Sequence, residues 1–340
     1  QPLHLIHNPD NTTTEWTFQG VTAVIVRNVA GWQVWFLDGQ SLLYLLTPSD
    51  GFRAQKYSPA NPPWPPTFPS LAFTPVAMTA DPATNDLVFL DRGADKASPA
   101  KPGLVVLVDP DTAPKIRRVA LQKVVEPLSL LALSGGDYLL GDGGKQQQQS
   151  PPVPADLTGN LVRVHVDRSN DPQWTATETV LLDPLASPLV SPTGLALGPA
   201  GDAFVLDTGL KPERPPAAFP FRPDVAKPAG LYRTRLDVAQ PSVTFVSQPG
   251  RLVYPQALAV ARGVAYVCDP GMPQVSSRDS TWRVRPHGFG VIVHFPNARL
   301  PQDAGQRVAA MSGVLGTVRD IVNGENPAQT YWELFTESPS

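Results

Sequence analysis

Short apolar runs, separated by turn residues, recur along the whole chain. The clearest example runs from Pro192 to Gly209, where two short strands at 194–197 and 203–206 flank a Gly- and Pro-containing turn at 198–202. No stretch keeps a helical periodicity over the roughly 10–12 residues that a helix requires. The pattern therefore predicts an all-β protein.

The same two-strand phrase occurs in at least three other places. In each copy a proline opens the first strand and an Asp-x-Gly corner closes the second; the opening prolines are Pro75, Pro127, Pro192 and Pro255. A two-strand phrase that recurs at irregular spacing is typical of the blades of a β-propeller.

Strand spacing predicts five complete four-stranded blades, with two strands left over at each end of the chain. The predicted blades are 21–29, 33–37, 41–46 and 53–57; 76–79, 86–90, 104–109 and 115–121; 128–133, 138–140, 160–167 and 175–182; 194–197, 203–206, 231–237 and 243–247; and 257–261, 265–268, 290–295 and 307–311. The N-terminal runs 3–7 and 15–18 and the C-terminal runs 318–322 and 330–335 remain.

We expect the four remaining strands to form one shared blade, with the N-terminal pair on its outside. This arrangement closes the ring without covalent bonds and leaves no exposed sheet edge. Residues 1–340 are thus predicted to form a single domain, a six-bladed β-propeller of four-stranded antiparallel blades.

Composition excludes several classes of protein. No run of about 18 apolar residues is present, so no membrane-spanning helix is expected. The net charge is −3 and the sequence has no basic stripe, which argues against a nucleic-acid groove. Cys268 is the single cysteine, so a disulfide framework or a cysteine zinc cluster is excluded, and we expect its side chain to be buried.

An exported location, secreted or periplasmic, is expected. The sequence begins at Gln1 rather than Met, which suggests processing, and it has few lysines but many prolines and threonines.

The connections between the second and third strands of four blades are long. They cover 92–102, 143–158, 208–229 and 270–287, and all are predicted to lie on one face of the propeller. Long loops on a rigid scaffold often carry function. Phe219, Phe221, Arg222 and Trp282 combine apolar rings with arginine, as recognition surfaces do. Alternatively, these proline-rich segments only fill a crowded rim.

A second candidate site is the mouth of the central channel, where the first strand of each blade starts. The residue after each opening proline differs between blades, and the set is Val76, Leu128, Thr193 and Gln256, with Thr22 and Arg319 at the corresponding positions of the first and last blades. The next position is small in every blade except the last, which has Asp320. Together with Glu126, the residues Thr193, Gln256, Arg319 and Asp320 could form a polar site, or Arg319 and Asp320 could simply pair with each other.

The aspartates that close the second strands have a different expected role. Asp38, Asp91, Asp142, Asp207 and Asp269 occupy the same position in successive blades. An aspartate there accepts backbone N–H bonds of its own turn, and the following glycine supplies a positive φ. We therefore interpret these aspartates as structural.

Common catalytic motifs are absent from the sequence. The five histidines show no paired spacing that would suit a metal centre. There is no Gly-x-Ser-x-Gly nucleophile turn and no phosphate-binding loop. These absences favour a binding propeller that recognises a small molecule or a protein and has no dedicated catalytic site.

The phrase from Pro192 to Gly209 resembles the NHL-type repeat of six-bladed propellers, and the resemblance covers most of residues 20–335. That superfamily includes the gluconolactonase and regucalcin lactonases, the paraoxonases, the strictosidine synthases and many binding propellers without enzymatic activity.

The lactonases hold a divalent metal above the channel, so the resemblance implies an alternative function as a metal-dependent hydrolase or lyase. A calcium ion would be bound by Glu126 and Asp320, with oxygens from Thr193 and Gln256, while Arg319 oriented a carbonyl or carboxylate substrate. The Pro-Asn-Gly phrase of the lactonases is Pro192-Thr193-Gly194 here, which lacks the amide ligand.

Residues 141–144, 155–167 and 255–260 also resemble phrases of the soluble quinoprotein sugar dehydrogenases. Those enzymes require a histidine at the start of an inner strand and a cluster of basic residues. This sequence has neither, so the resemblance implies a shared scaffold.

Overall fold

Every element in the described part of the chain is a β-strand. The computed structural model describes residues 74–93, 101–110, 115–144, 159–182, 187–198, 201–209, 227–238, 241–247, 252, 255–261 and 264–269, and only isolated strands within 1–73 and 270–310. Within these residues there is no helix with the length and hydrophobicity that crossing a membrane requires.

The chain divides into two compact units, residues 1–140 with 162–180 and residues 141–161 with 181–340. The division falls within strands β12 (Asp137–Asp142) and β13 (Asn160–Asp167). The prediction of a single domain is not tested by this division, and each unit is described by itself.

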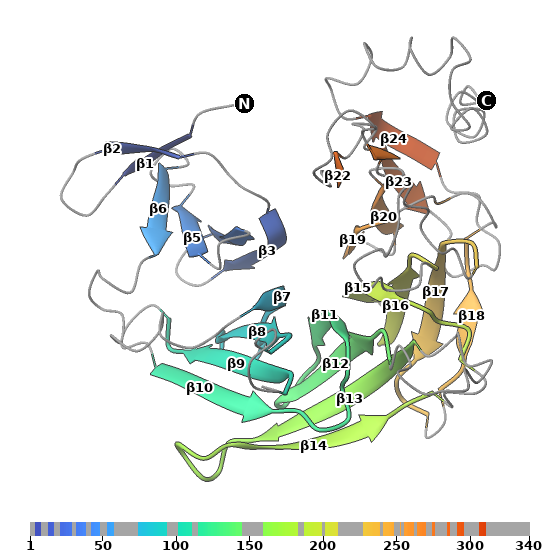
Figure 1. Cartoon of the computed structure of the whole chain (residues 1–340), viewed down its shortest axis with the longest axis horizontal. Coiled ribbons are helices and arrows are strands. Elements are labelled where there is room, and N and C mark those ends of the chain that lie inside the picture. The colour runs from blue at the N-terminus through green and yellow to red at the C-terminus, as the bar shows by residue number, and fades with distance from the viewer. Residues whose placement is uncertain are drawn as a thin grey trace. The chain divides into compact units, whose positions relative to one another are not determined.

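Most strands of the first unit belong to four-stranded antiparallel stretches in which consecutive strands are neighbours (Figure 1). These are β3 (Val21–Asn28), β4 (Trp32–Asp38), β5 (Leu42–Thr47) and β6 (Arg53–Tyr57); β7 (Pro75–Ala80), β8 (Leu87–Asp91), β9 (Gly103–Val108) and β10 (Lys115–Ala120); and β11 (Pro127–Ala132), β12 (Asp137–Asp142), β13 (Asn160–Asp167) and β14 (Thr175–Val180).

The second unit contains two further sheets of four strands. They are β15 (Pro192–Leu197), β16 (Asp202–Asp207), β17 (Gly230–Arg235) and β18 (Val243–Phe245), and β19 (Ala257–Ala261), β20 (Val264–Asp269), β23 (Val291–Phe295) and β24 (Gln306–Ala310). The prediction of several four-stranded antiparallel sheets is confirmed, with strand ends shifted by a few residues.

Two features differ from the sequence-based expectation. β1 (His4–His7) and β2 (Thr13–Trp16) extend the first sheet, and β1 runs parallel to β6 with Ile6 opposite Ala54. We had expected these strands in a separate shared blade. An isolated two-stranded hairpin is marginally stable, and the free edge of β6 offers it unpaired backbone groups. The C-terminal strands expected at 318–322 and 330–335 lie outside the described residues, so six blades and ring closure stay predictions.

The second difference lies in the connection 270–287, which was expected to be loop only. It contains a short antiparallel pair, β21 (Gln274–Val275) and β22 (Val284–Arg285).

Hydrophobic cores form between successive sheets within each unit. In the first unit, Trp35 and Leu37 of β4 pack with Phe89, and the other face of β8, at Val88 and Leu90, packs toward the next sheet. In the second unit, the same kind of core joins the sheet of β16 to the sheet of β20. First strands of successive sheets also contact one another, β3 with β7, β7 with β11, and β15 with β19. Such face-to-face packing of antiparallel sheets is how neighbouring propeller blades pack.

Two of the second strands are buried along their whole length. All residues of β8 and β16 are buried. In β20, by contrast, burial alternates, and Cys268 lies on the less buried side. The expectation that Cys268 is fully buried is therefore wrong. Partial burial, together with the nearby Asp269, still raises the pKa of its thiol.

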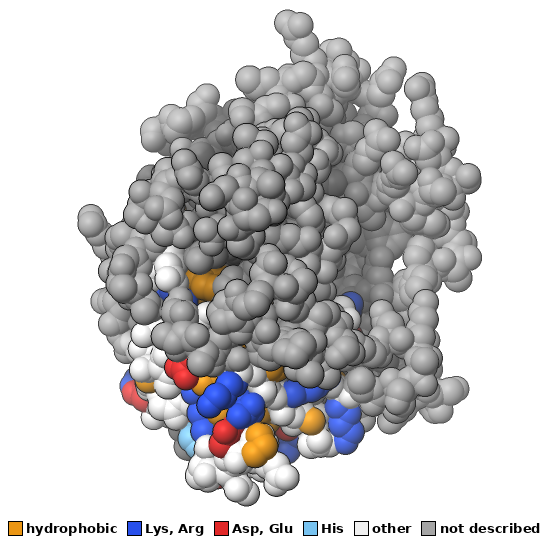
Figure 2. Space-filling view, turned by 90° about the vertical axis from the view of Figure 1, so that its left-hand side faces the viewer, with side chains coloured by type: hydrophobic (Ala, Val, Ile, Leu, Met, Phe, Trp, Pro, Cys, Tyr) orange, Lys and Arg blue, Asp and Glu red, His pale blue; other side chains and the backbone are white. Residues whose placement is uncertain are grey.

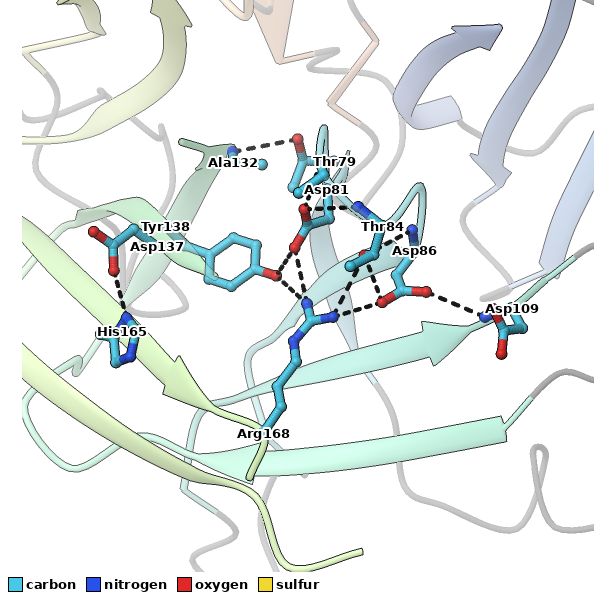
Figure 3. A network of polar contacts seen from close by, with 11 residues as sticks. Thr79, Asp81, Thr84, Asp86, Asp109, Ala132, Asp137, Tyr138, His165 and Arg168 are labelled. Atoms are coloured by element: carbon cyan, nitrogen blue, oxygen red, sulfur yellow. Dashed lines mark hydrogen bonds and ion pairs between the residues drawn. The ribbon is translucent and has the colours of Figure 1, made fainter. Parts of the chain in front are cut away.

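One arginine of the first unit joins three strands at the end opposite the Asp-x-Gly corners (Figure 3). Arg168, just after β13, donates from Nη2 to Asp81 Oδ2 at 2.8 Å and from Nη1 to Asp86 Oδ2 at 2.7 Å. The hydroxyl of Tyr138 donates to the same Asp81 oxygen at 2.8 Å. The Trp174 ring covers the guanidinium at 4.9 Å. Both carboxylates are almost fully buried, so they depend on this cation.

We expect Arg168→Ala to lower the free energy of unfolding by about 3–5 kcal/mol, because it leaves two buried carboxylates without their counter-charge. Arg168→Lys should lower the free energy of unfolding less, because lysine keeps the positive charge although it lacks the planar guanidinium that bonds to both carboxylates. Urea denaturation measures both effects. Arg235→Ala is the matched control, because the Arg235–Asp237 pair is about two-thirds exposed and screened by solvent, so its loss should leave stability nearly unchanged. Equal losses for Arg168→Ala and the control would contradict the proposed role.

Candidate functional site

The Asp-x-Gly corners are built as the sequence predicted. Asp91, Asp142 and Asp207 are buried, and each accepts a hydrogen bond from the backbone N–H two residues later, at Gly93, Gly144 and Gly209. These three glycines have φ of 90°, 71° and 66°, a region that favours glycine. The structural role predicted for the closing aspartates is confirmed at these three corners.

The corner aspartates also bond to the segment that precedes the opening proline of the same sheet. Asp207 accepts from the backbone N–H groups of Val190 at 2.6 Å and Ser191 at 3.1 Å. Asp91 accepts from that of Thr74 at 2.9 Å. Each carboxylate therefore fixes the end of the second strand against the start of the first strand, which is where the candidate site was predicted.

The variable position after the opening proline coincides with a β-bulge. Pro192 pairs with Asp207 and Gly194 with Leu206, which leaves Thr193 as the extra residue. The same irregularity occurs at Val76 and at Thr22. A bulged residue has no partner across the ladder. The position that follows Thr193 is more restricted, because a Cβ on Gly194 would lie 3.1 Å from the Cβ of Leu206.

Thr193 and Gln256 come together in the second unit. Thr193 Oγ1 donates to the carbonyl of Pro255 at 3.4 Å, and Gln256 Nε2 donates to the same carbonyl at 3.3 Å. The Gln256 side chain therefore bonds to the residue that directly precedes it in the chain, and Gln256 is exposed. The starts of β15 and β19 thus present two adjacent polar side chains.

Glu126, in the first unit, forms an ion pair with Arg92, the middle residue of the Asp91 corner. Arg118 Nη2 lies 2.7 Å from Asp91 Oδ2, so the corner carries a second ion pair. Glu126 and Arg92 are partly exposed, which makes them a charged pair at the starting end of β11. An engaged carboxylate is less available to a cation, which weakens the calcium hypothesis at Glu126.

The other predicted site residues, Arg222, Trp282, Arg319 and Asp320, lie outside the described residues. In the described part of the chain, no group of three or more His, Cys, Asp or Glu side chains could hold a metal ion. Calcium binding by Glu126 and Asp320 stays a prediction.

Sequence reasoning missed Lys227, which lies beside the Asp207 corner. Its Nζ is 3.8 Å from Asp207 Oδ2 and 5.2 Å from the centre of the Tyr232 ring. Its backbone N–H donates to the carbonyl of Gly209 at 3.3 Å. The only sequence signal was a lysine shortly before the glycine that opens β17.

Asp137, the first residue of β12, forms another charged group in the first unit, with two residues of the neighbouring strand β13. It accepts a bond from Arg163 Nε at 3.1 Å and lies 2.7 Å from His165 Nδ1. Burial would raise the pKa of Asp137, but the bonds from Arg163 and His165 outweigh it and hold that pKa below its usual range. Figure 2 shows basic side chains next to acidic ones on the described surface.

Comparison with known proteins gives a likeness of fold only. No family model and no curated protein matches the chain. Similar solved structures include a protein of unknown function from Bacteroides thetaiotaomicron, at 11% identity with a TM-score of 0.43; 76% of this chain aligns with it, and the chain spans only 59% of that protein.

Two further likenesses cover most of this chain. A PQQ-bound aldose sugar dehydrogenase from Streptomyces coelicolor has 10% identity and a TM-score of 0.46, with 86% of this chain and 84% of that one covered. YCF48 from Cyanidioschyzon merolae has 9% identity and a TM-score of 0.47, with 91% and 76% covered. These neighbours are β-propeller proteins. At TM-scores below 0.5 they carry no functional argument.

We expect Asp207→Asn to lower the free energy of unfolding by about 2–4 kcal/mol. The asparagine amide would direct an N–H donor at a backbone N–H group, and the protein would lose the charge-assisted hydrogen bonds that the carboxylate accepts. Chemical denaturation monitored by circular dichroism measures this loss. Asp237→Asn, at a largely exposed aspartate, is the matched control and should leave stability nearly unchanged. Comparable effects of the two substitutions would contradict the structural role of Asp207.

The stabilisation from Asp137 should depend on pH. Because its pKa is lower in the folded protein than in the unfolded chain, its contribution is complete above the unfolded value of about 3.9 and is lost as the pH falls through the folded value. The difference in unfolding free energy between the wild type and Asp137→Asn should therefore be largest above about pH 5 and shrink under acid conditions. Chemical denaturation of both proteins at a series of pH values, from acid conditions to above about pH 5, measures this difference. A difference that stays constant with pH would show that the carboxylate charge is not responsible.

Proposed function

We propose that this protein is a β-propeller that binds a small molecule or a protein partner through the long connections at the Asp-x-Gly end of its sheets. The finer architecture, six blades in a ring closed by both termini, belongs to this proposal. The strand order of the described sheets and their face-to-face packing within each unit support it.

The observation that carries the proposal is the way the stems of one long connection are held. The chain leaves the sheet at Gly209 and returns at Lys227, and these two residues bond to each other at 3.3 Å. Gly209 is in turn bonded to Asp207 at 2.6 Å. A Cβ at Gly209 would lie 2.0 Å from the Lys227 carbonyl oxygen, so the stems are too close for any other residue. The scaffold thus presents residues 210–226 from one fixed point.

The sequence of this connection suits recognition. Phe219, Phe221 and Arg222 would supply the apolar rings and the guanidinium that commonly anchor a partner, with Trp282 contributed by the connection 270–287. An exported location fits the low lysine content and the many prolines and threonines. A metal-dependent hydrolase remains the alternative suggested by the sequence resemblance. Among the described residues, no cluster of three or more His, Cys, Asp or Glu side chains supports it.

Replacement of residues 212–226 by a short Gly-Ser linker should abolish binding without loss of stability, because Asp207, Gly209 and Lys227 remain in place. Partners captured from the source organism by the full chain would be identified by mass spectrometry. Their affinity for the two proteins would then be measured by calorimetry with purified components.

The matched control replaces residues 297–304 with the same linker. This connection joins β23 to β24 and, because the strands are antiparallel, lies at the other end of its sheet from the Asp269 corner. The control should bind as the wild type does. An unchanged affinity after replacement of 212–226 would refute a role for that connection.

A further inference from the structure

One face of the sheet that contains β19 and β20 lies outside the described hydrophobic cores. The other face packs in the core shared with the sheet of β16, and its residues there are Leu258, Val260, Ala265 and Val267. On the outlying face, Ala257 and Ala259 are exposed. Cys268 and Tyr266 lie opposite them in the ladder and are half-buried. None of these four residues belongs to a core cluster of the described part of the chain.

This composition is unusual for a sheet face in contact with water. An antiparallel sheet with one solvated face usually carries polar residues there. Strand β13 follows this rule, since its exposed positions include Arg163 and His165. Strand β8, which packs in two different cores, is instead apolar on both faces. The outlying face of β19 and β20 resembles β8 in composition, so it has the character of a face that another element covers.

The order of packing among the described sheets indicates which element this is. The sheet of β3 packs on that of β7, the sheet of β7 packs on that of β11, and the sheet of β15 packs on that of β19. In each pair, a sheet is covered by the one that follows it in the sequence. Strand β24 ends at Ala310. By the same order, the chain after Ala310 should cover the outlying face.

The C-terminal segment suits this role in length and pattern. Residues 311–340 follow β24 and belong to the same unit. The connection 311–317 can span more than about 20 Å when extended, whereas packed sheets lie about 10 Å apart. In the run 330–335, Trp332 and Leu334 flank Glu333. A strand here would place Trp332 and Leu334 on one side and the glutamate on the other.

We propose that residues 318–335 of this chain pack on the face formed by Ala257, Ala259, Tyr266 and Cys268, with Trp332 and Leu334 against it. The two alanines leave room for these large side chains. The proposal concerns the second unit alone and needs no strand from the N-terminus, because β1 and β2 pair in the first sheet. It does not depend on the proposed binding function, since residues 210–226 take no part in it.

The single cysteine of the chain lies on this face, so its thiol reports directly on what covers it. The test treats the full chain carrying Leu334→Cys with a short bismaleimide, and peptide mass spectrometry follows cross-linking to Cys268 within one chain. Glu333→Cys is the matched control. We expect the cross-link to form at least about tenfold faster with Leu334→Cys, because neighbours along a strand point to opposite sides.

Equal rates for the two variants would show that residues 330–335 do not pack on the face, and would overturn the proposal. Cross-links mainly between two chains would identify a second copy as the occupant and would overturn it as well. The same holds if neither variant cross-links while both thiols still react with iodoacetamide.

A second measurement uses the native thiol alone and stands even if the cysteine variants fail to fold. Trp332→Ser should raise the rate at which iodoacetamide labels Cys268 by at least about tenfold, because loss of a large buried ring raises the fraction of undocked segment. Leu197→Ser, at an exposed leucine of β15, is the control and should leave that rate unchanged. Unchanged labelling in Trp332→Ser would refute the docking. Binding by residues 210–226 would be unaffected by any of these results, so the two proposals fail separately.

Discussion

The structure depends on one repeated interaction, a buried aspartate that joins the end of a second strand to the start of the first. At Asp207 three backbone N–H groups converge on one carboxylate, two from the segment before Pro192 and one from the corner itself. These groups lie where hydrogen bonds of the sheet ladder end, so without the aspartate they would be buried and unpaired. The same bonds fix the point from which each long connection leaves its sheet.

Packing between successive sheets is the second interaction that stabilises each unit. Strand β8 is apolar on both faces, because one face packs on the preceding sheet and the other on the following one. The first strands carry small residues where neighbouring sheets approach, as Gly194 shows beside Leu206 and Leu258. At the opposite ends of the strands, Arg168, which follows β13, bonds to the buried Asp81 and Asp86 in the turn between β7 and β8 and so joins two sheets (Figure 3).

Most of this fold could be predicted from the sequence, because apolar runs, opening prolines and Asp-x-Gly corners are local signals. The partner of β1 could not be predicted, since many edges are equally open to a short polar strand. The bulge at Thr193 was also invisible, although it explains why that position varies between blades. For the candidate site, the sequence correctly predicted a structural role for the corner aspartates Asp91, Asp142 and Asp207, whereas a binding role for the variable positions stays a prediction. It missed Lys227 because burial of its amine arises only when β16 and β17 pair.

The bulges after the opening prolines have a consequence for how such a chain can change over time. A residue that has no partner across the ladder can be replaced without disturbing register, whereas its neighbours Pro192 and Gly194 cannot. The first two strands of the sheets that begin at β3, β7 and β15 therefore each contain one position outside the ladder register. Substitutions at Thr193 would accumulate under drift more readily than substitutions at Pro192 or Gly194, and a library randomised at Thr193 should retain more folded members than one randomised at either neighbour.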